Sequence, residues 1–221
     1  MHWPKPNDEI GSINNLDLMS NSNWAIRKQM VAARSALSRQ QSHDAAVNLA
    51  RIARHYPPLM RSTSIASYIP VRGEISPHAV IRTMNINRAC IPVICDLKAG
   101  QMKFCSTDHA LLAYPQALYK PDIRRNEYGI PEPILDTIPL QTRALDAVLV
   151  PLAAFDRFGS RLGLGAGFYD RAFEYRLWNR HLMRPILIGL AHEFQEVDQL
   201  DSAPWDVPLD VIITPKEIIR P

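Results

Sequence analysis

The sequence lacks several features that would place it in a membrane, secreted or metal-cage class. Of its 221 residues, 47% are hydrophobic, yet no apolar run reaches the ~20 residues that span a bilayer, and no early segment resembles a secretion signal. Its three cysteines, Cys90, Cys95 and Cys105, match no zinc-binding spacing, and an odd number argues against a disulfide framework. We therefore expect a soluble, cytoplasmic protein with reduced, structural cysteines and no membrane partner.

A strong charge of one sign is also missing. Lysine and arginine number 25 against 22 acidic residues, for a formal net charge of +3. No basic run is interleaved with aromatic residues, so we expect a small anionic ligand rather than a nucleic-acid partner. No Walker P-loop is present and no side chain stands out as a nucleophile. His78, His109 and His192 have no metal-binding or triad spacing, which favours surface or core roles.

What the sequence does contain is a glycine cluster in residues 161–173 (RLGLGAGFYDRAF). A short apolar run at 145–150 predicts a buried strand, and helical periodicity begins at Phe168, so the order is strand, long loop, glycines, helix. Glycines let a ligand approach the backbone closely, and N–H groups at a helix start attract anions. The strand-to-glycine gap is too long for an ordinary dinucleotide-binding turn. By itself the pattern also fits a mobile loop or a tight turn.

Charged residues next to these glycines indicate what kind of anion would bind. Arg161 opens the segment and Asp170 follows its last glycine by three residues, so a cation and a carboxylate flank the loop. A phosphate chain with its magnesium needs both signs, although Asp170 could instead only stabilise the first turn of its helix. Glu74, at a predicted strand end, is either an acceptor for ligand N–H groups or an ordinary exposed loop carboxylate.

The remaining pattern predicts an α/β fold: a three-layer α/β/α single domain with a mostly parallel sheet and N-terminal helices. We expect a flexible leader over residues 1–22 and one domain over 23–221, with ligands at the carboxyl ends of the strands. Ser42 is predicted to cap the second helix, and Ser76 a later one. The proline-rich residues 107–144 are predicted to be irregular and to help wall a site. Strands are predicted at 64–70, 89–95, 103–106, 145–150, 186–191 and 210–214.

Five segments together resemble the 5-formyltetrahydrofolate cyclo-ligase family, also called 5,10-methenyltetrahydrofolate synthetases. The most specific is 150–173 (VPLAAFDRFGSRLGLGAGFYDRAF). The others, in the family's order, are 26–38 (IRKQMVAARSALS), 67–81 (SYIPVRGEISPHAVI), 129–133 (GIPEP) and 205–215 (WDVPLDVIITP).

The resemblance implies a ligase that uses ATP and magnesium to convert 5-formyltetrahydrofolate to 5,10-methenyltetrahydrofolate, releasing ADP and phosphate. The catalytic residues that it implies are Arg27 and Arg161, and the implied magnesium ligands are Asp170 and Asp206. The implied ATP contacts are Asn23, Arg27, Arg161, Leu162, Gly163, Leu164, Gly165, Ala166, Gly167, Phe168 and Tyr169. The implied folate contacts are Ile69, Glu74, Leu164, Gly165, Ala166, Gly167 and Phe168.

Two positions depart from the family pattern. Asn23 stands where members usually carry a basic residue, and Ala166 where some relatives have lysine and others glycine. These departures leave open an alternative: a non-catalytic nucleotide- or RNA-associated regulator on the same fold. A phosphosugar isomerase or acyl transferase is a further alternative, but the sequence supplies no obvious acid and base for either. We expect a monomer whose partners are the folate substrate and ATP.

Overall fold

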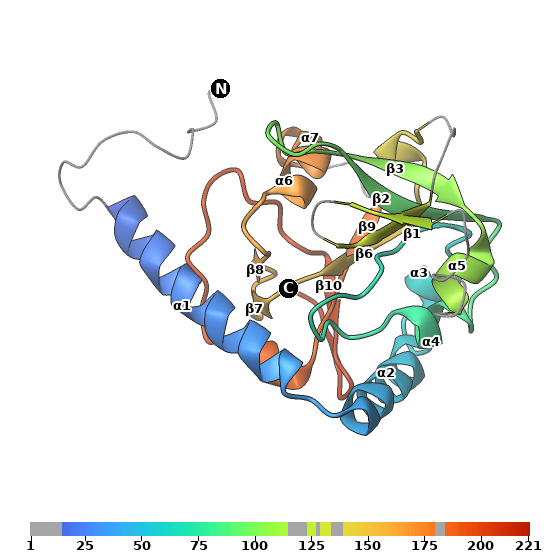
Figure 1. The fold of residues 1–221 in the computed structure, drawn as a ribbon, viewed down its shortest axis with the longest axis horizontal. Coiled ribbons are helices and arrows are strands. Elements are labelled where there is room, and N and C mark those ends of the chain that lie inside the picture. The colour runs from blue at the N-terminus through green and yellow to red at the C-terminus, as the bar shows by residue number, and fades with distance from the viewer. Residues whose placement is uncertain (1–14, 115–122, 127–128, 134–138, 180–183) are drawn as a thin grey trace.

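The structure, a computed structural model, describes residues 15–114, 123–126, 129–133, 139–179 and 184–221 (Figure 1). Its centre is a seven-stranded sheet. In spatial order the strands are β11 (Ile218–Ile219), β10 (Val211–Ile213), β9 (Ile186–Leu190), β6 (Ala147–Pro151), β1 (Ser64–Ala66), β2 (Arg88–Asp96) and β3 (Gln101–Thr107). Each of the six predicted strands is present in this sheet.

The interior of the sheet is parallel and its two edges are antiparallel. β1 pairs in parallel with β2 and β6, β6 with β9, and β9 with β10. The edge strands β3 and β11 run antiparallel to β2 and β10. The expected mostly parallel sheet is therefore confirmed.

Alternate side chains of the central strands form two separate cores. Ala147 and Leu149 of β6 face one core, whereas Val148 and Val150 face the other. The first core is covered by α2 (Arg39–Ala53), α3 (Pro57–Met60), α4 (His78–Ile81) and α5 (His109–Ala113). The second is covered by α6 (Phe168–Phe173) and α7 (Tyr175–Trp178). Helices on both faces give the three layers that the sequence predicts (Figure 1).

The N-terminal helix α1 (Asn15–Ser35) lies along the side of the sheet, where Met30 packs near a small hairpin of β7 (Ala154–Phe155) and β8 (Arg161–Leu162). The expected leader ended at residue 22, but α1 begins at Asn15, so that boundary falls inside a helix. Residues 1–14 lie outside the described chain.

The predicted cap of α2 was wrong by one turn. Ser38, not Ser42, caps the helix: its hydroxyl accepts from the Gln41 N–H at 3.2 Å, and the Gln41 side chain accepts from the Ser38 N–H at 2.9 Å. This reciprocal pair satisfies two N–H groups that the helix itself leaves unbonded, which Ser42 would not do.

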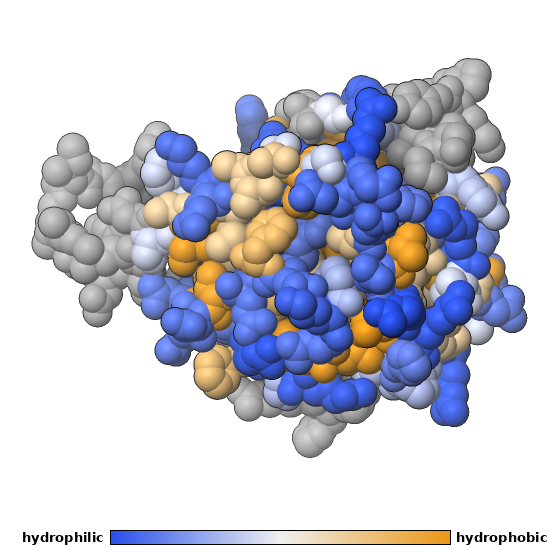
Figure 2. All heavy atoms as spheres, turned by 90° about the horizontal axis from the view of Figure 1, so that it is seen from below, coloured by the Kyte–Doolittle hydropathy of each residue, from blue (hydrophilic) through white to orange (hydrophobic). Residues whose placement is uncertain are grey.

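The segment 107–144 is more ordered than expected where it is described. It contains the end of β3, α5, a hairpin of β4 (Ile123–Arg125) and β5 (Pro131–Pro133), and the short 3₁₀ helix η2 (Thr142–Ala144); a second 3₁₀ helix, η3, spans Glu193–Gln195. Across the described residues, none of the helices is both long and apolar enough to cross a membrane. On the face drawn in Figure 2, hydrophilic side chains surround smaller apolar patches.

Candidate functional site

The glycine loop joins β8 to α6 and takes a conformation that suits glycine. Gly165 and Gly167 have φ values of 101° and 63°, in the left-handed region that residues with a Cβ rarely adopt. At Gly163 a Cβ would meet no atom within 4 Å, so the backbone there borders open space. The loop thus leaves room for a ligand beside its main chain.

The two charged residues that flank this loop are bonded to each other. Nη2 of Arg161 donates to Oδ1 of Asp170 at 2.7 Å, and Nη1 donates to the Val207 carbonyl at 2.6 Å. The same Asp170 oxygen accepts from the Val207 N–H at 3.0 Å. Arg161 and Asp170 are therefore held together against the segment that carries Asp206.

Asp206 lies within the electrostatic influence of this pair. Its Oδ2 accepts from the Ala203 N–H at 2.8 Å. Burial raises the pKa of Asp206, the charge of Asp170 raises that pKa further, and Arg161 lowers it. No cluster of three or more His, Cys, Asp or Glu side chains that could cage a metal is found in the described residues. Two neighbouring carboxylates without a full cage suit magnesium, which keeps several waters and binds phosphate oxygens.

Helix α1 also contacts the loop. Nε of Arg27 donates to the Gly163 carbonyl at 2.8 Å, and Nδ2 of Asn23 donates to the Asp201 carbonyl at 3.2 Å. Arg171, one turn into α6, bonds to the carbonyls of Gly100 and Ala166. Through these carbonyl groups the loop is tied to α1 and to the β2–β3 turn.

Glu74 is buried, so the exposed-carboxylate interpretation of this residue is wrong. Its side chain is 6% exposed, and Oε2 accepts from the Val71 N–H at 3.0 Å. Burial raises the pKa of Glu74 from its ordinary 4.5 to about 7, against the lowering effects of that hydrogen bond and of Arg34 and Arg72. A carboxyl group beside a cavity with a pKa shifted toward neutral pH is typical of a functional site.

A cavity of about 220 Å³ brings the glycine loop and the Glu74 side together. Its walls also include the β4–β5 hairpin, as expected for part of the 107–144 segment. Ten of the predicted site residues line it: Ile69, Glu74, Arg161, Gly163, Leu164, Ala166, Gly167, Phe168, Tyr169 and Asp170. Five do not: Asn23, Arg27, Leu162, Gly165 and Asp206.

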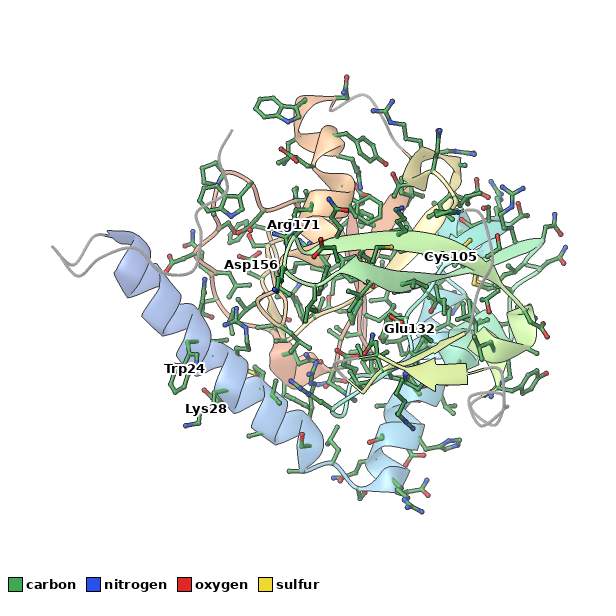
Figure 3. The ribbon with its side chains drawn as sticks, turned by 45° about the horizontal axis from the view of Figure 1, so that its top comes forward. Trp24, Lys28, Cys105, Glu132, Asp156 and Arg171 are labelled. Atoms are coloured by element: carbon green, nitrogen blue, oxygen red, sulfur yellow. The ribbon has the colours of Figure 1, made fainter. Side chains whose placement is uncertain are left out.

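The structure adds cavity residues that the sequence did not single out. Glu132, on β5, is buried and accepts from the Ile94 N–H at 3.2 Å and from the Asn126 amide at 2.8 Å (Figure 3). Arg72 lines the cavity with a φ of 50°, a strained value for a residue other than glycine. The glutamate inside GIPEP and the arginine before Gly73 were the available signals, but neither has a spacing that predicts its place.

Two of the histidines and two of the cysteines are buried. His78 is buried against the Leu112 carbonyl, and His192 is buried with Nε2 3.3 Å from the Gly73 carbonyl; burial lowers the pKa of both rings. Cys90 and Cys105 are buried and Cys95 is exposed, and none of the three forms a disulfide. Of the surface or core roles expected for these rings, His78 and His192 have core positions.

Comparisons with known proteins point in one direction. The model of the 5-formyltetrahydrofolate cyclo-ligase family matches residues 19–215. The curated 5-formyltetrahydrofolate cyclo-ligase of Escherichia coli K12 is 32% identical over 190 residues, covering 84% of this chain and 96% of that protein. The protein of the same name from Haemophilus influenzae is 34% identical over 196 residues, covering 85% and 95%.

Solved structures agree on the fold. The 5,10-methenyltetrahydrofolate synthetase of Aquifex aeolicus superposes with a TM-score of 0.68 at 23% identity, covering 90% of this chain and 92% of that one. The corresponding synthetase from Mycoplasma pneumoniae gives a TM-score of 0.62 at 26% identity, covering 88% and 99%.

Proposed function

The chain belongs to the 5-formyltetrahydrofolate cyclo-ligase family, and from that premise we propose that it uses ATP and magnesium to convert 5-formyltetrahydrofolate to 5,10-methenyltetrahydrofolate, with release of ADP and phosphate. The observation that carries the proposal is the single cavity lined by both Glu74 and the glycine loop. A nucleotide and a folate that must exchange a phosphoryl group have to meet in one space, and this cavity supplies it.

The ATP phosphates are assigned to the glycine loop. Its main chain borders open space at Gly163, where Arg27 donates to the carbonyl, and Arg161 precedes the loop and bonds to Asp170 after it. Asn23 and Ala166 contribute no charge, so the two arginines and the backbone N–H groups are the donors to the phosphate oxygens. Arg161 would give up part of its bond with Asp170 when it takes a phosphate oxygen.

Magnesium is assigned to Asp170 and Asp206. Burial raises the pKa of Asp206, repulsion from Asp170 raises it further, and a divalent cation would remove that repulsion. When bound, the metal would neutralise phosphate charge and orient the γ-phosphoryl group. The Val207 N–H holds the Asp170 carboxylate in place, and the Ala203 N–H holds that of Asp206.

The folate is assigned to the side of the cavity that carries Ile69 and Glu74, with the inner loop from Leu164 to Phe168 against it. Ile69 and Leu164 offer apolar surface to the pterin ring, and the Glu74 carboxylate accepts hydrogen bonds from ring N–H groups. This arrangement turns the formyl group toward the phosphate side of the same cavity.

The chemistry needs positioning more than a protein nucleophile. The formyl oxygen attacks the γ-phosphorus, a new P–O bond forms, and the bond to ADP breaks. N10 of the folate then attacks the activated formyl carbon, loses its proton to solvent, and expels phosphate with the former formyl oxygen. Phosphoryl transfer of this kind depends on alignment and charge neutralisation, which the arginines and the loop supply.

A direct assay tests the proposal. Purified protein incubated with 5-formyltetrahydrofolate, ATP and magnesium should form the methenyl chromophore with one ADP per product, and omission of ATP should stop it. Nucleotide binding without turnover would instead support the non-catalytic regulator.

A further inference from the structure

Arg34 is a buried cation for which the assigned ligand contacts give no role. It lies near the end of α1 with 1% exposure, and its Nη1 donates to the Leu152 carbonyl at 2.8 Å. Its Nε and Nη2 are also buried, and neither has a hydrogen-bond partner among the described residues. Burying guanidinium N–H groups without partners is costly, so the position calls for a compensating negative charge.

Glu74 is the carboxylate that faces this cation. Its Oε1 lies 4.0 Å from Nη1 of Arg34, and the two side chains are 6% and 0% exposed. That separation is too long for a hydrogen bond but short enough for a strong attraction away from water. Glu74 lines the cavity, whereas Arg34 lies behind it. The cation therefore acts on the cavity through the carboxylate.

The backbone fixes this arrangement. Gly73 has a φ of 73°, and a Cβ built on it would lie 2.5 Å from the Arg34 carbonyl oxygen. Its own carbonyl lies 3.3 Å from Nε2 of His192. The segment that carries Glu74 is thus packed directly on the end of α1, the helix that also brings Arg27 to the glycine loop.

We propose that Arg34 is a positioning residue that keeps Glu74 ionised and directed into the cavity when bound substrate excludes water, so that Glu74 accepts hydrogen bonds from the pterin N–H groups. The inference rests on the proposed function for the identity of the ligand. A neutral Glu74 would present an O–H donor to those N–H groups, and the match would be lost.

The surroundings of Glu74 support this role. Burial has already raised the pKa of Glu74 to about 7, and Arg34 opposes that rise. A ligand that removes more water raises the pKa further unless a cation stays in place. The titratable and charged groups that face Glu74 or its cation are Arg34 from α1, Arg72 from the same loop, Tyr68, Tyr169 from α6, and His192.

The test compares Arg34→Met, which removes the cation, with Arg34→Lys, which keeps it. We measure kcat/KM for 5-formyltetrahydrofolate from pH 5.5 to 9, the KM for ATP, and the thermal midpoint. In Arg34→Met the acid limb of kcat/KM should move at least one pH unit upward, a tenfold loss on that limb, with the KM for ATP within twofold of wild type. Arg34→Lys, which keeps the charge, should show little of this shift, and Arg51→Met, which removes an exposed cation of α2, should show none.

A double variant separates this role from a structural one. Glu74→Gln should abolish the limb, and Arg34→Met should cost little more in that background, because the two residues act as one unit. Two results would overturn the proposal in a folded Arg34→Met protein. One is a loss of kcat/KM that is equal at every pH, and the other is a loss that adds fully to that of Glu74→Gln in the double variant.

A second measurement needs no turnover. The titration of the Glu74 carboxyl carbon, followed by NMR in wild type and in Arg34→Gln, a neutral side chain that can still donate a hydrogen bond, with and without folate, should show a higher pKa in the variant. If Arg34→Met does not fold, or if wild type makes no methenyl product, this titration still decides: identical curves contradict the proposal. An inactive wild type with displaced curves would contradict the proposed function and leave the Arg34–Glu74 coupling supported.

Discussion

Arg161 and Asp170 form an ion pair across the ends of the glycine loop, with Nη2 of Arg161 2.7 Å from Oδ1 of Asp170. The sequence placed both residues beside one anion, and the structure places them beside each other. Their side chains are only 6% and 17% exposed, so each lowers the cost of burying the other. The nucleotide and metal assignments therefore use a pair that is already assembled.

Replacing Arg161 with alanine should harm both stability and turnover. The change removes the Arg161 donor from the Val207 carbonyl and from the partly buried Asp170, whose Oδ1 keeps the Val207 N–H, and this should cost about 2 kcal/mol of unfolding free energy. If Arg161 also binds phosphate, turnover of the folded fraction should fall at least tenfold, or about 1.4 kcal/mol. Methenyl formation and urea unfolding measure the two effects.

Arg176→Ala is the matched control, because Arg176 also pairs with an aspartate, Asp210, at 2.7 Å but lies outside the cavity lining. Its turnover should stay near that of wild type. An Arg161→Ala enzyme with activity within about twofold of wild type would show that the ion pair is only structural.

Asp206→Asn tests the magnesium assignment. The amide keeps the shape of the side chain but removes the charge, so the magnesium concentration for half-maximal turnover should rise about tenfold or more while the KM for folate changes little. The variant should also be no less stable than wild type without metal, because it removes a charge that is disfavoured by burial and by repulsion from Asp170, the two causes that raise the pKa of Asp206. Exposed Asp198→Asn serves as the control, and an unchanged magnesium titration for Asp206→Asn would refute the assignment.

Gly163→Ala should separate ligand binding from folding. No atom lies within 4 Å of a Cβ at this position, and no positive φ strains it, so stability should be unchanged or slightly higher. The added methyl group enters the space assigned to ATP phosphates, so the KM for ATP should rise several-fold. Gly73→Ala provides the contrast, because its Cβ would collide with the Arg34 backbone and destabilise the fold. Unchanged nucleotide affinity in Gly163→Ala would show that the ATP phosphates bind elsewhere.

Titration of Glu74 should make the free energy of unfolding fall as pH rises. Its pKa is 4.5 when unfolded and about 7 when folded, so between these values the native state binds more protons than the unfolded chain. At about 1.4 kcal/mol per pH unit, this group lowers the unfolding free energy by about 3 kcal/mol from pH 4.5 to 7, and by no more above that. Glu74→Gln should lack this decline.

Urea unfolding at pH 5 and pH 8 checks that difference in wild type, Glu74→Gln and the exposed control Glu174→Gln. The control should retain the wild-type pH dependence. If Glu74→Gln retains it as well, Glu74 does not titrate near neutral pH.

The sequence predicted the parallel core well because local signals agree there. Short apolar runs such as 145–150 and 186–191 are long enough for strands and too short for most helices, and they alternate with helical segments. It did not predict β11 or the antiparallel direction of β3, because strand direction depends on how connections return across the sheet. The cap at Ser38 was missed because two serines precede the apolar pattern, and only the reciprocal bond to Gln41 distinguishes them.

The candidate site was predicted only in part for a similar reason. The glycine loop and its flanking charges are contiguous in the chain, so their proximity follows from spacing. The burial of Glu74 depends on Arg34, forty residues earlier, and on the distant segments that cover it. The bond between Arg161 and Asp170 likewise depends on Val207, which approaches from near the C-terminus. Such long-range contacts leave no local pattern in the sequence.

The central claim is that ATP phosphorylates the formyl oxygen of the folate inside this cavity. Single-turnover reaction of 5-formyltetrahydrofolate labelled with ¹⁸O in the formyl group tests it most directly, with mass analysis of the phosphate released. The account predicts one labelled oxygen in phosphate for each methenyl product, because the formyl oxygen departs with the phosphoryl group. Unlabelled phosphate formed in equal amount with the methenyl product would contradict it, since the phosphoryl group would then have passed to water.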